Sequence, residues 1–145
     1  MMIKTRASEI KNELSIGFHR ASTEYLKVGL GLFHDERKKK TSEVQASIGN
    51  LSTAIELMIK AFLVTQNPVL VFCDLPLEIK ILFTAENLPA VSPNWKALEL
   101  ELRSYTYKTI GLSETVSAFG IFCPGEKIKL QSYFRLLESI RNKSL

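Results

Sequence analysis

Arg141 and Asn142, near the end of the 145-residue sequence, are the residues whose types and order could most directly support chemistry. A guanidinium carries a permanent positive charge and several N–H donors in one plane, which suits the oxygen atoms of a phosphate group. A histidine a few residues later would add an imidazole that titrates near neutrality and can transfer protons. Such a pair could support RNA cleavage by the 2′-hydroxyl of the RNA itself, without a metal ion.

The sequence contains no histidine at that place, because its last histidine is His34. The helical pattern around Arg141 continues to Leu145 without a C-cap glycine or a polar tail. Either the protein has lost such a histidine, or this sequence is a shortened form of a longer chain. The abrupt stop favours the second alternative, so we expect the natural chain to continue with a histidine within the next three positions. We expect the 145-residue form to be inactive.

Both residues of the pair also have a structural interpretation. The helix dipole favours an arginine in the last turn of a helix, and an asparagine there often ends the helix. In the catalytic interpretation, Asn142 would orient the phosphate or the guanidinium. A histidine five residues after Arg141 would be rotated by about 140° and displaced by about 7.5 Å along the helix. One helix alone would not direct both groups at one phosphate, so a dimer would help.

Glu56 and Lys60 are the second candidate pair, four residues apart in an apolar helical segment. This order and spacing favour an ion pair on one helix face. Because Glu56 stands between Ile55 and Leu57, an alternative is that it faces the helix carrying Arg141 and holds that side chain in place.

A run of four basic residues, Arg37, Lys38, Lys39 and Lys40, lies between the first two helical patterns. It is either a solvated loop or a loop that contacts phosphate groups. The whole chain carries a net charge of +4 and has a pI near 9.1, which is compatible with an anionic partner such as RNA or a nucleotide.

Other chemical signatures are missing from the sequence. It has no glycine-rich phosphate loop, no HExxH motif and no carboxylate cluster at metal-ligand spacing, so we expect no metal and no cofactor. Cys73 and Cys123 stand far apart in apolar surroundings, which predicts buried, reduced thiols rather than a zinc site. No signal peptide or membrane span is predicted, because charge or proline interrupts the apolar runs. We expect a soluble cytoplasmic protein without a membrane partner.

The hydrophobic periodicity predicts an all-α fold. Apolar residues recur every three or four positions from Ser8 to Phe33 or Asp35, and again from Thr41 or Ser42 to Asn67 and Pro68. A short polar turn joins these two long helices, so we expect an antiparallel hairpin. Without a shift in composition, the chain reads as one domain over residues 1–145, an antiparallel bundle of about five helices.

The remaining elements are shorter. Val69 to Phe72 could form a strand, and a helix is predicted from Pro76 to Ala85. A loop over 89–95 precedes a segment over 96–108 that is read as a helix although its alternation is also typical of a strand. Further predictions are a helix over 112–122 with Ser113 as its cap and a last helix from about Glu126. Its apolar stripe comprises Leu130, Tyr133, Leu137 and Ile140.

Three segments resemble the HEPN superfamily. Residues 136–145 resemble its signature helix, in which an arginine and a polar residue such as Asn precede a short spacer and a histidine. Residues 50–63 are similar to the second helix of many members, and residues 110–113, with the following helix and proline break, resemble the stretch before the last helix. The resemblance spans most of the chain, from about Ser42 to Leu145.

The resemblance implies a metal-independent endoribonuclease of the toxin or phage-defence type, with Arg141 and Asn142 as its catalytic residues and two motifs joined across a homodimer. An antitoxin or a nucleotidyltransferase would be a possible partner. The alternatives are a non-catalytic module for dimerisation and for binding RNA or nucleotide, and a structural bundle that recognises another protein.

Overall fold

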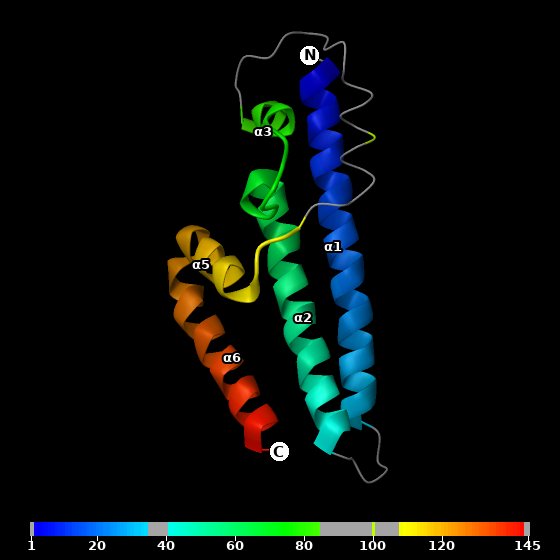
Figure 1. Ribbon diagram of the computed structural model, residues 1–145, viewed down its shortest axis with the longest axis vertical. Helices are drawn as coiled ribbons and strands as arrows, with labels where there is room; N and C mark the ends of the chain where they lie inside the picture. Colours follow the sequence, from blue (N-terminus) through cyan, green and yellow to red (C-terminus); the bar gives the residue numbers. More distant parts are fainter. Residues whose placement is uncertain (1, 35–40, 85–99, 101–107, 144–145) are drawn as a thin grey trace.

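The two N-terminal helices form an antiparallel hairpin, as Figure 1 shows. The computed structural model describes residues 2–34, 41–84, 100 and 108–143. Helix α1 spans Met2–His34 and helix α2 spans Thr41–Gln66, and the two pack against each other along their length. The all-α prediction and the predicted hairpin are confirmed. Helix α1 begins at Met2 rather than at Ser8, and the other ends agree with the predicted ones.

Small residues at seven-residue spacing bring α1 and α2 close together. They pair across the interface as Ser15 with Ala61, Ser22 with Ala54, and Gly29 with Ser47. The hydroxyl group of each of the three serines donates a hydrogen bond to the carbonyl oxygen of the opposite residue, at 2.6 to 2.9 Å. A Cβ atom at Gly29 would lie only 2.9 Å from the Leu51 side chain. A seven-residue repeat keeps one face of each helix on its partner, so the hairpin stays closely packed over this stretch.

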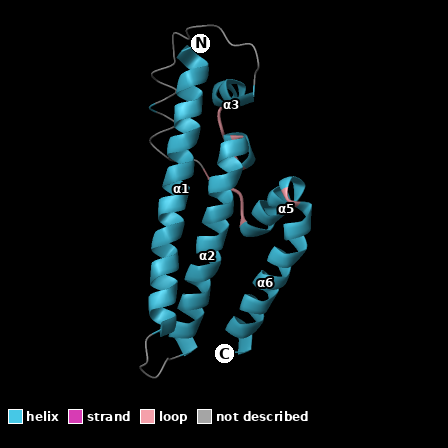
Figure 2. Cartoon of the chain, turned by 180° about the vertical axis from the view of Figure 1, so that it is seen from behind, coloured by secondary structure: helices cyan, strands magenta, loops and turns pink. Residues whose placement is uncertain are grey.

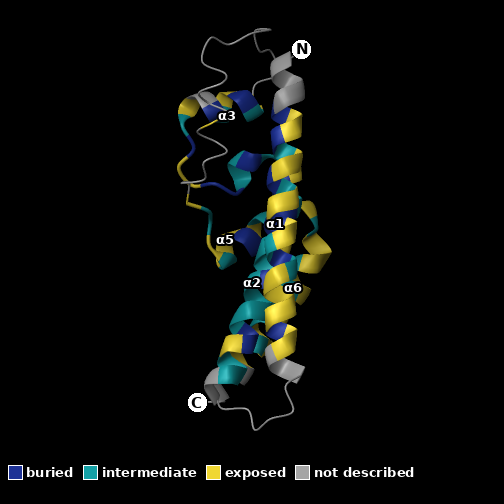
Figure 3. Cartoon of the chain, turned by 90° about the vertical axis from the view of Figure 1, so that its right-hand side faces the viewer, coloured by how far each residue is buried: buried dark blue, intermediate teal, exposed yellow. Residues whose placement is uncertain are grey.

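The hydrophobic core lies where α2 ends. The main cluster joins buried residues of α1, of the second half of α2 and of the segment after it: Ile10, Leu14, Phe18, Ile59, Ala61, Leu63, Val64, Val71, Phe72, Leu75 and Ile79. In Figure 3 these buried positions give way to intermediate and exposed ones towards the other end of the hairpin. The hairpin therefore has one well-covered end and one more open end.

A short 3-10 helix, η1 (Pro68–Leu70), and helix α3 (Leu77–Thr84) cover that core. The side chain of Asn67 caps η1 by accepting a hydrogen bond from the Val69 amide at 3.0 Å. Phe72 forms an isolated antiparallel bridge with Thr109. The apolar run after α2 is thus partly 3-10 helix and partly bridge. The predicted helix from Pro76 is confirmed to within one residue at its start.

The middle predictions fall mostly outside the described residues. This holds for the loop over 89–95 and for the segment over 96–108, of which only Leu100, which is helical, and Lys108, which is irregular, are described. The end of the third predicted helix, at Ala85, is also outside the described ranges.

Helices α5 (Leu112–Phe122) and α6 (Pro124–Lys143) follow each other almost without a break. The prediction that Ser113 caps α5 is wrong, because Gly111 occupies the cap position without a side-chain bond. Instead the Thr115 hydroxyl donates to the Gly111 carbonyl at 2.7 Å. Helix α6 begins two residues before the predicted Glu126, since a proline fits the first turn of a helix.

Helix α6 runs antiparallel to α2, and α2 lies between α1 and α6 in the two opposite views of Figures 1 and 2. None of the side chains described on α6 is fully buried. Of the predicted apolar stripe, Leu130 and Leu137 are half-buried, whereas Tyr133 is exposed. Helix α6 therefore covers α2 only in part.

The cysteine prediction is corrected. Both thiols are free, but Cys73 is exposed and Cys123 is half-exposed rather than buried. Cys73 follows the bridge residue Phe72, and Cys123 forms the cap between α5 and α6, so both belong to connections at the surface of the fold.

Within the described residues, α2 is the one helix that is long and apolar enough to cross a membrane, over Glu43–Gln66. The central helix of a soluble protein satisfies the same criterion, and α2 contacts α1, α5 and α6. The cytoplasmic location without a membrane partner stays a prediction.

Candidate functional site

The Arg141–Asn142 pair lies in the last turn of α6, at the open end of the bundle. The half-buried residues of this helix recur every three or four positions at Lys127, Leu130, Phe134 and Leu137. Arg141 comes four residues after Leu137 and therefore continues this series in register.

The ends of α1 and α2 lie at the same end of the molecule as the C-terminal end of α6 (Figure 1). Helix α1 ends there at His34, and α2 begins there at Thr41. The basic run Arg37, Lys38, Lys39 and Lys40 lies outside the described residues. The described residues on either side of it, His34 and Thr41, both lie at the end of the bundle where α6 ends.

Glu56 and Lys60 form the ion pair that their spacing predicts, with 3.7 Å between Lys60 Nζ and Glu56 Oε2. Their position is not on the surface, because only 4% of the Lys60 side chain is exposed. The Lys60 ammonium group also donates a hydrogen bond to Thr109 Oγ1 at 3.0 Å. This pair therefore fastens the segment around Thr109 to α2, next to the bridge formed by Phe72.

The two candidate pairs lie at different levels of the bundle. Leu130 of α6 lines the same cavity as Ile55 and Ile59 of α2, which places Leu130 near the level of Glu56. Arg141 comes eleven residues after Leu130, or about 16 Å along the helix, in the direction of the start of α2. Within one chain, the structure does not bring Glu56 to Arg141.

A polar cavity of about 260 Å³ between α5 and α6 contains residues that sequence reasoning missed. Its polar lining comprises Ser113 of α5 and Gln131, Arg135 and Glu138 of α6. Arg135 and Glu138 have opposite charges, so the cavity does not by itself favour an anion. Arg135 was detectable in the sequence as a second arginine on the motif helix, six residues before Arg141.

In the described part of the chain, no three His, Cys, Asp or Glu side chains lie where they could hold a metal ion together. The ion pairs of Glu24 with Lys27 and of Glu126 with Lys129 lie on exposed helix surfaces.

No protein-family model matches the chain, and searches of curated proteins and of solved structures give no match either. The resemblance to the HEPN superfamily, which is carried by residues 136–145, 50–63 and 110–113, therefore stays a prediction.

Proposed function

We propose that this chain is an HEPN-like domain that contacts RNA phosphates through Arg141, and that belongs to the metal-independent endoribonucleases of toxin or phage-defence type. The observation that carries the proposal is the position of Arg141 and Asn142, in the last turn of α6 and at the end of the bundle where α1 ends and α2 begins. An RNA strand could reach a helix end there without displacing the core, which lies at the other end of the hairpin.

The chemistry assigned to the site follows from its residue types. The Arg141 guanidinium would bind and polarise a phosphate oxygen, and Asn142 would orient the phosphate group. Cleavage also needs a group that moves protons near neutral pH, and the sequence contains no histidine after His34. The 145-residue chain therefore binds RNA without cutting it.

We expect Arg141→Ala to weaken binding of single-stranded RNA about five- to tenfold, because it removes one of the proposed phosphate contacts. The slope of log K against log salt concentration should fall by about 0.7, the value for one contact on a single strand. Fluorescence anisotropy at several salt concentrations measures both effects. Arg20→Ala, which removes the same charge from an exposed position halfway along α1, is the matched control and should leave the salt slope unchanged.

The catalytic part has its own test, in which the chain is extended by one histidine after Leu145 and incubated with RNA in EDTA. We expect cleavage by the extended chain, none by the 145-residue chain, and none by the extended chain with Arg141→Ala. Cleavage by the 145-residue chain itself, abolished by Arg141→Ala, would contradict its predicted inactivity. RNA binding without any cleavage would favour the binding module, and absence of salt-sensitive binding in all forms would refute both.

A dimerisation and RNA- or nucleotide-binding module is the second candidate, favoured by the exposed apolar side of α6. Ile128 is 71% exposed, and Tyr133 and Leu136 are also exposed on this helix. Single apolar residues are common on protein surfaces, but several on one helix indicate an interaction face. A second copy covering this face would bring two motif helices together.

We expect the double variant Ile128→Glu with Leu136→Glu to convert a dimer into a monomer in light scattering, because it places charges in an apolar contact. The matched control is Leu77→Glu on α3, which is 69% exposed but far from α6 along the fold. A wild-type chain that stays at the 16.4 kDa of a monomer at high micromolar concentration would refute the dimer.

A further inference from the structure

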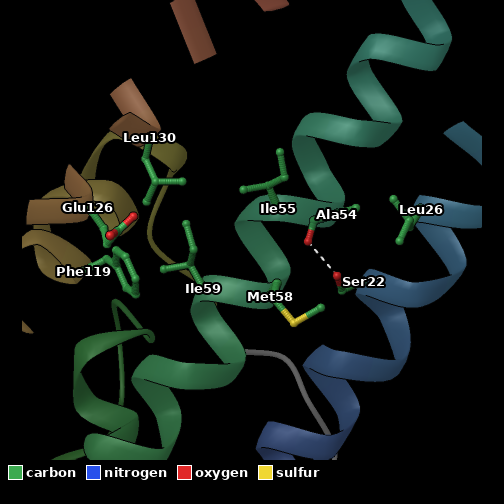
Figure 4. Close-up of a pocket in the computed structure, with 9 residues that line it drawn as sticks. All are labelled: Ser22, Leu26, Ala54, Ile55, Met58, Ile59, Phe119, Glu126 and Leu130. Carbon is green, nitrogen blue, oxygen red and sulfur yellow. Dashed lines mark hydrogen bonds between the residues drawn. The ribbon is translucent and has the colours of Figure 1, made fainter. Parts of the chain in front are cut away.

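An apolar cavity of about 330 Å³ lies over the middle of α2, between α1 and the start of α6 (Figure 4). Ala54, Ile55, Met58 and Ile59 of α2 form its floor, and the remaining lining residues come from the two sides: Ser22 and Leu26 of α1, Phe119 of α5, and Glu126 and Leu130 of α6. This volume is within the range of small-molecule pockets. The Ser22 hydroxyl already donates to the Ala54 carbonyl at 2.6 Å, so this hydroxyl proton is not free for a ligand.

Glu126 is the one charged residue in the lining. Figure 4 shows its carboxylate directed towards the cavity, beside the ring of Phe119. A carboxylate next to an aromatic ring attracts a cation in two ways, by charge and through the negative face of the ring. Apolar walls with one such corner favour a ligand that is mostly apolar and carries one positive charge at its end.

Glu126 is available for such a ligand. Its present partner is Lys129, three residues later on the same helix, with 3.7 Å between the charged atoms. The two side chains are 56% and 65% exposed, and an exposed pair of this kind contributes little free energy. A ligand ammonium group could therefore replace the Lys129 ammonium group at small cost, while its apolar part leaves water for the cavity.

We propose that this cavity is a binding site for a small organic cation, a primary ammonium group on an apolar body of about ten non-hydrogen atoms. The site is separate from the proposed RNA contact, because Glu126 stands fifteen residues before Arg141, about 22 Å along α6. The proposal does not depend on the RNA function, since neither Arg141 nor Asn142 lines the cavity.

The test uses 2-phenylethylammonium and its neutral analogue 2-phenylethanol, titrated into the full chain by calorimetry and by methyl NMR. We expect the ammonium compound to bind about two- to fivefold more tightly than the alcohol, the range for an exposed ion pair, with shifts at Ile55, Met58 and Leu130. Glu126→Gln should remove this preference and leave the affinity for the alcohol unchanged. The unchanged alcohol affinity also verifies that the variant is folded.

Two control variants separate the causes. Glu114→Gln removes an acidic residue from the first turn of α5, outside the cavity, and should keep the preference for the cation. Met58→Ala should weaken both compounds equally, because it removes apolar contact only. The proposal is overturned if neither compound binds saturably at millimolar concentration, if both bind equally to the wild-type chain, or if Glu114→Gln acts like Glu126→Gln.

Discussion

Ser22→Leu is expected to lower the free energy of unfolding by about 3 kcal/mol, one of the two largest effects that the structure predicts for a single change. Ser22 is 1% exposed and faces Ala54 in the close contact between α1 and α2. A leucine would place extra carbon atoms where the helix backbones approach each other, and it would remove the buried hydrogen bond to the Ala54 carbonyl. The helices would have to separate, which would also strain the pairs above and below.

Urea denaturation followed by circular dichroism measures this loss as a lower midpoint with an unchanged slope. The matched control is Ser8→Leu, the same substitution at an exposed position of the same helix. We expect a change within about 0.5 kcal/mol there. Equal effects of the two variants would mean that the close contact of the helices contributes nothing specific to stability.

Lys60→Ala is the second large effect, with an expected loss of about 2 to 3 kcal/mol. The substitution leaves Glu56 partly buried without its cation, removes the hydrogen bond to Thr109, and opens a cavity where the aliphatic part of Lys60 packs. Lys60→Met should cost less, because it keeps most of that volume. Adding Glu56→Gln to Lys60→Met should recover further stability, since no uncompensated charge then remains.

Chemical denaturation of the three variants measures these losses, and the exposed ion pair of α6 supplies the comparison. Lys129→Ala breaks a pair of similar length, Glu126 with Lys129, at the surface, and should change stability by less than about 0.5 kcal/mol. If Lys60→Ala were as mild as Lys129→Ala, the buried position of Lys60 would have no energetic consequence, contrary to our interpretation.

Large apolar residues at helical spacing were sufficient to predict α1, α2 and most of α6, whereas α5 was predicted from the residues at its start and from the proline and glycine after it. The close contact between α1 and α2 escaped this reasoning, because Ser15, Ser22 and Gly29 are small and partly polar and do not count as core residues in an apolar pattern. Their seven-residue spacing was visible in the sequence. Its matching series on α2, Ser47, Ala54 and Ala61, would have indicated a close helix pair.

The caps were harder to predict than the helices. A serine followed by a glutamate resembles a helix start, so Ser113 was assigned as the cap of α5, but a cap position needs an extended backbone. Gly111 has that conformation, with φ near −78° and ψ near 178°. The position of the cap depends on the segment before the helix. Here that segment is held by the hydrogen bond from the Ile110 amide to the Val71 carbonyl oxygen.

For the candidate site, spacing predicted the pairing of Glu56 with Lys60 but not its burial. A lysine is usually exposed, whereas this one is buried and donates to Thr109, which is bridged to Phe72. The distance between Glu56 and Arg141 depends on the position of α6 along the axis of α2. The residue pattern within either helix does not specify that position. The cavity beside Glu126 was missed for the same reason, because its walls come from four helices.

Contacting residues of α1 and α2 near the turn are close in sequence, and this affects the order in which the protein folds. Ser47 and Gly29 are eighteen residues apart in the sequence, and only six residues separate α1 from α2. Closing so short a loop costs little chain entropy, and local contacts of this kind are typical of fast-folding helical proteins. We therefore infer a folding nucleus that starts at the turn and propagates along the hairpin, with α6 joining after the transition state. In φ-value analysis, substitutions at Ser47 would then slow folding, whereas substitutions at Leu130 would mainly accelerate unfolding.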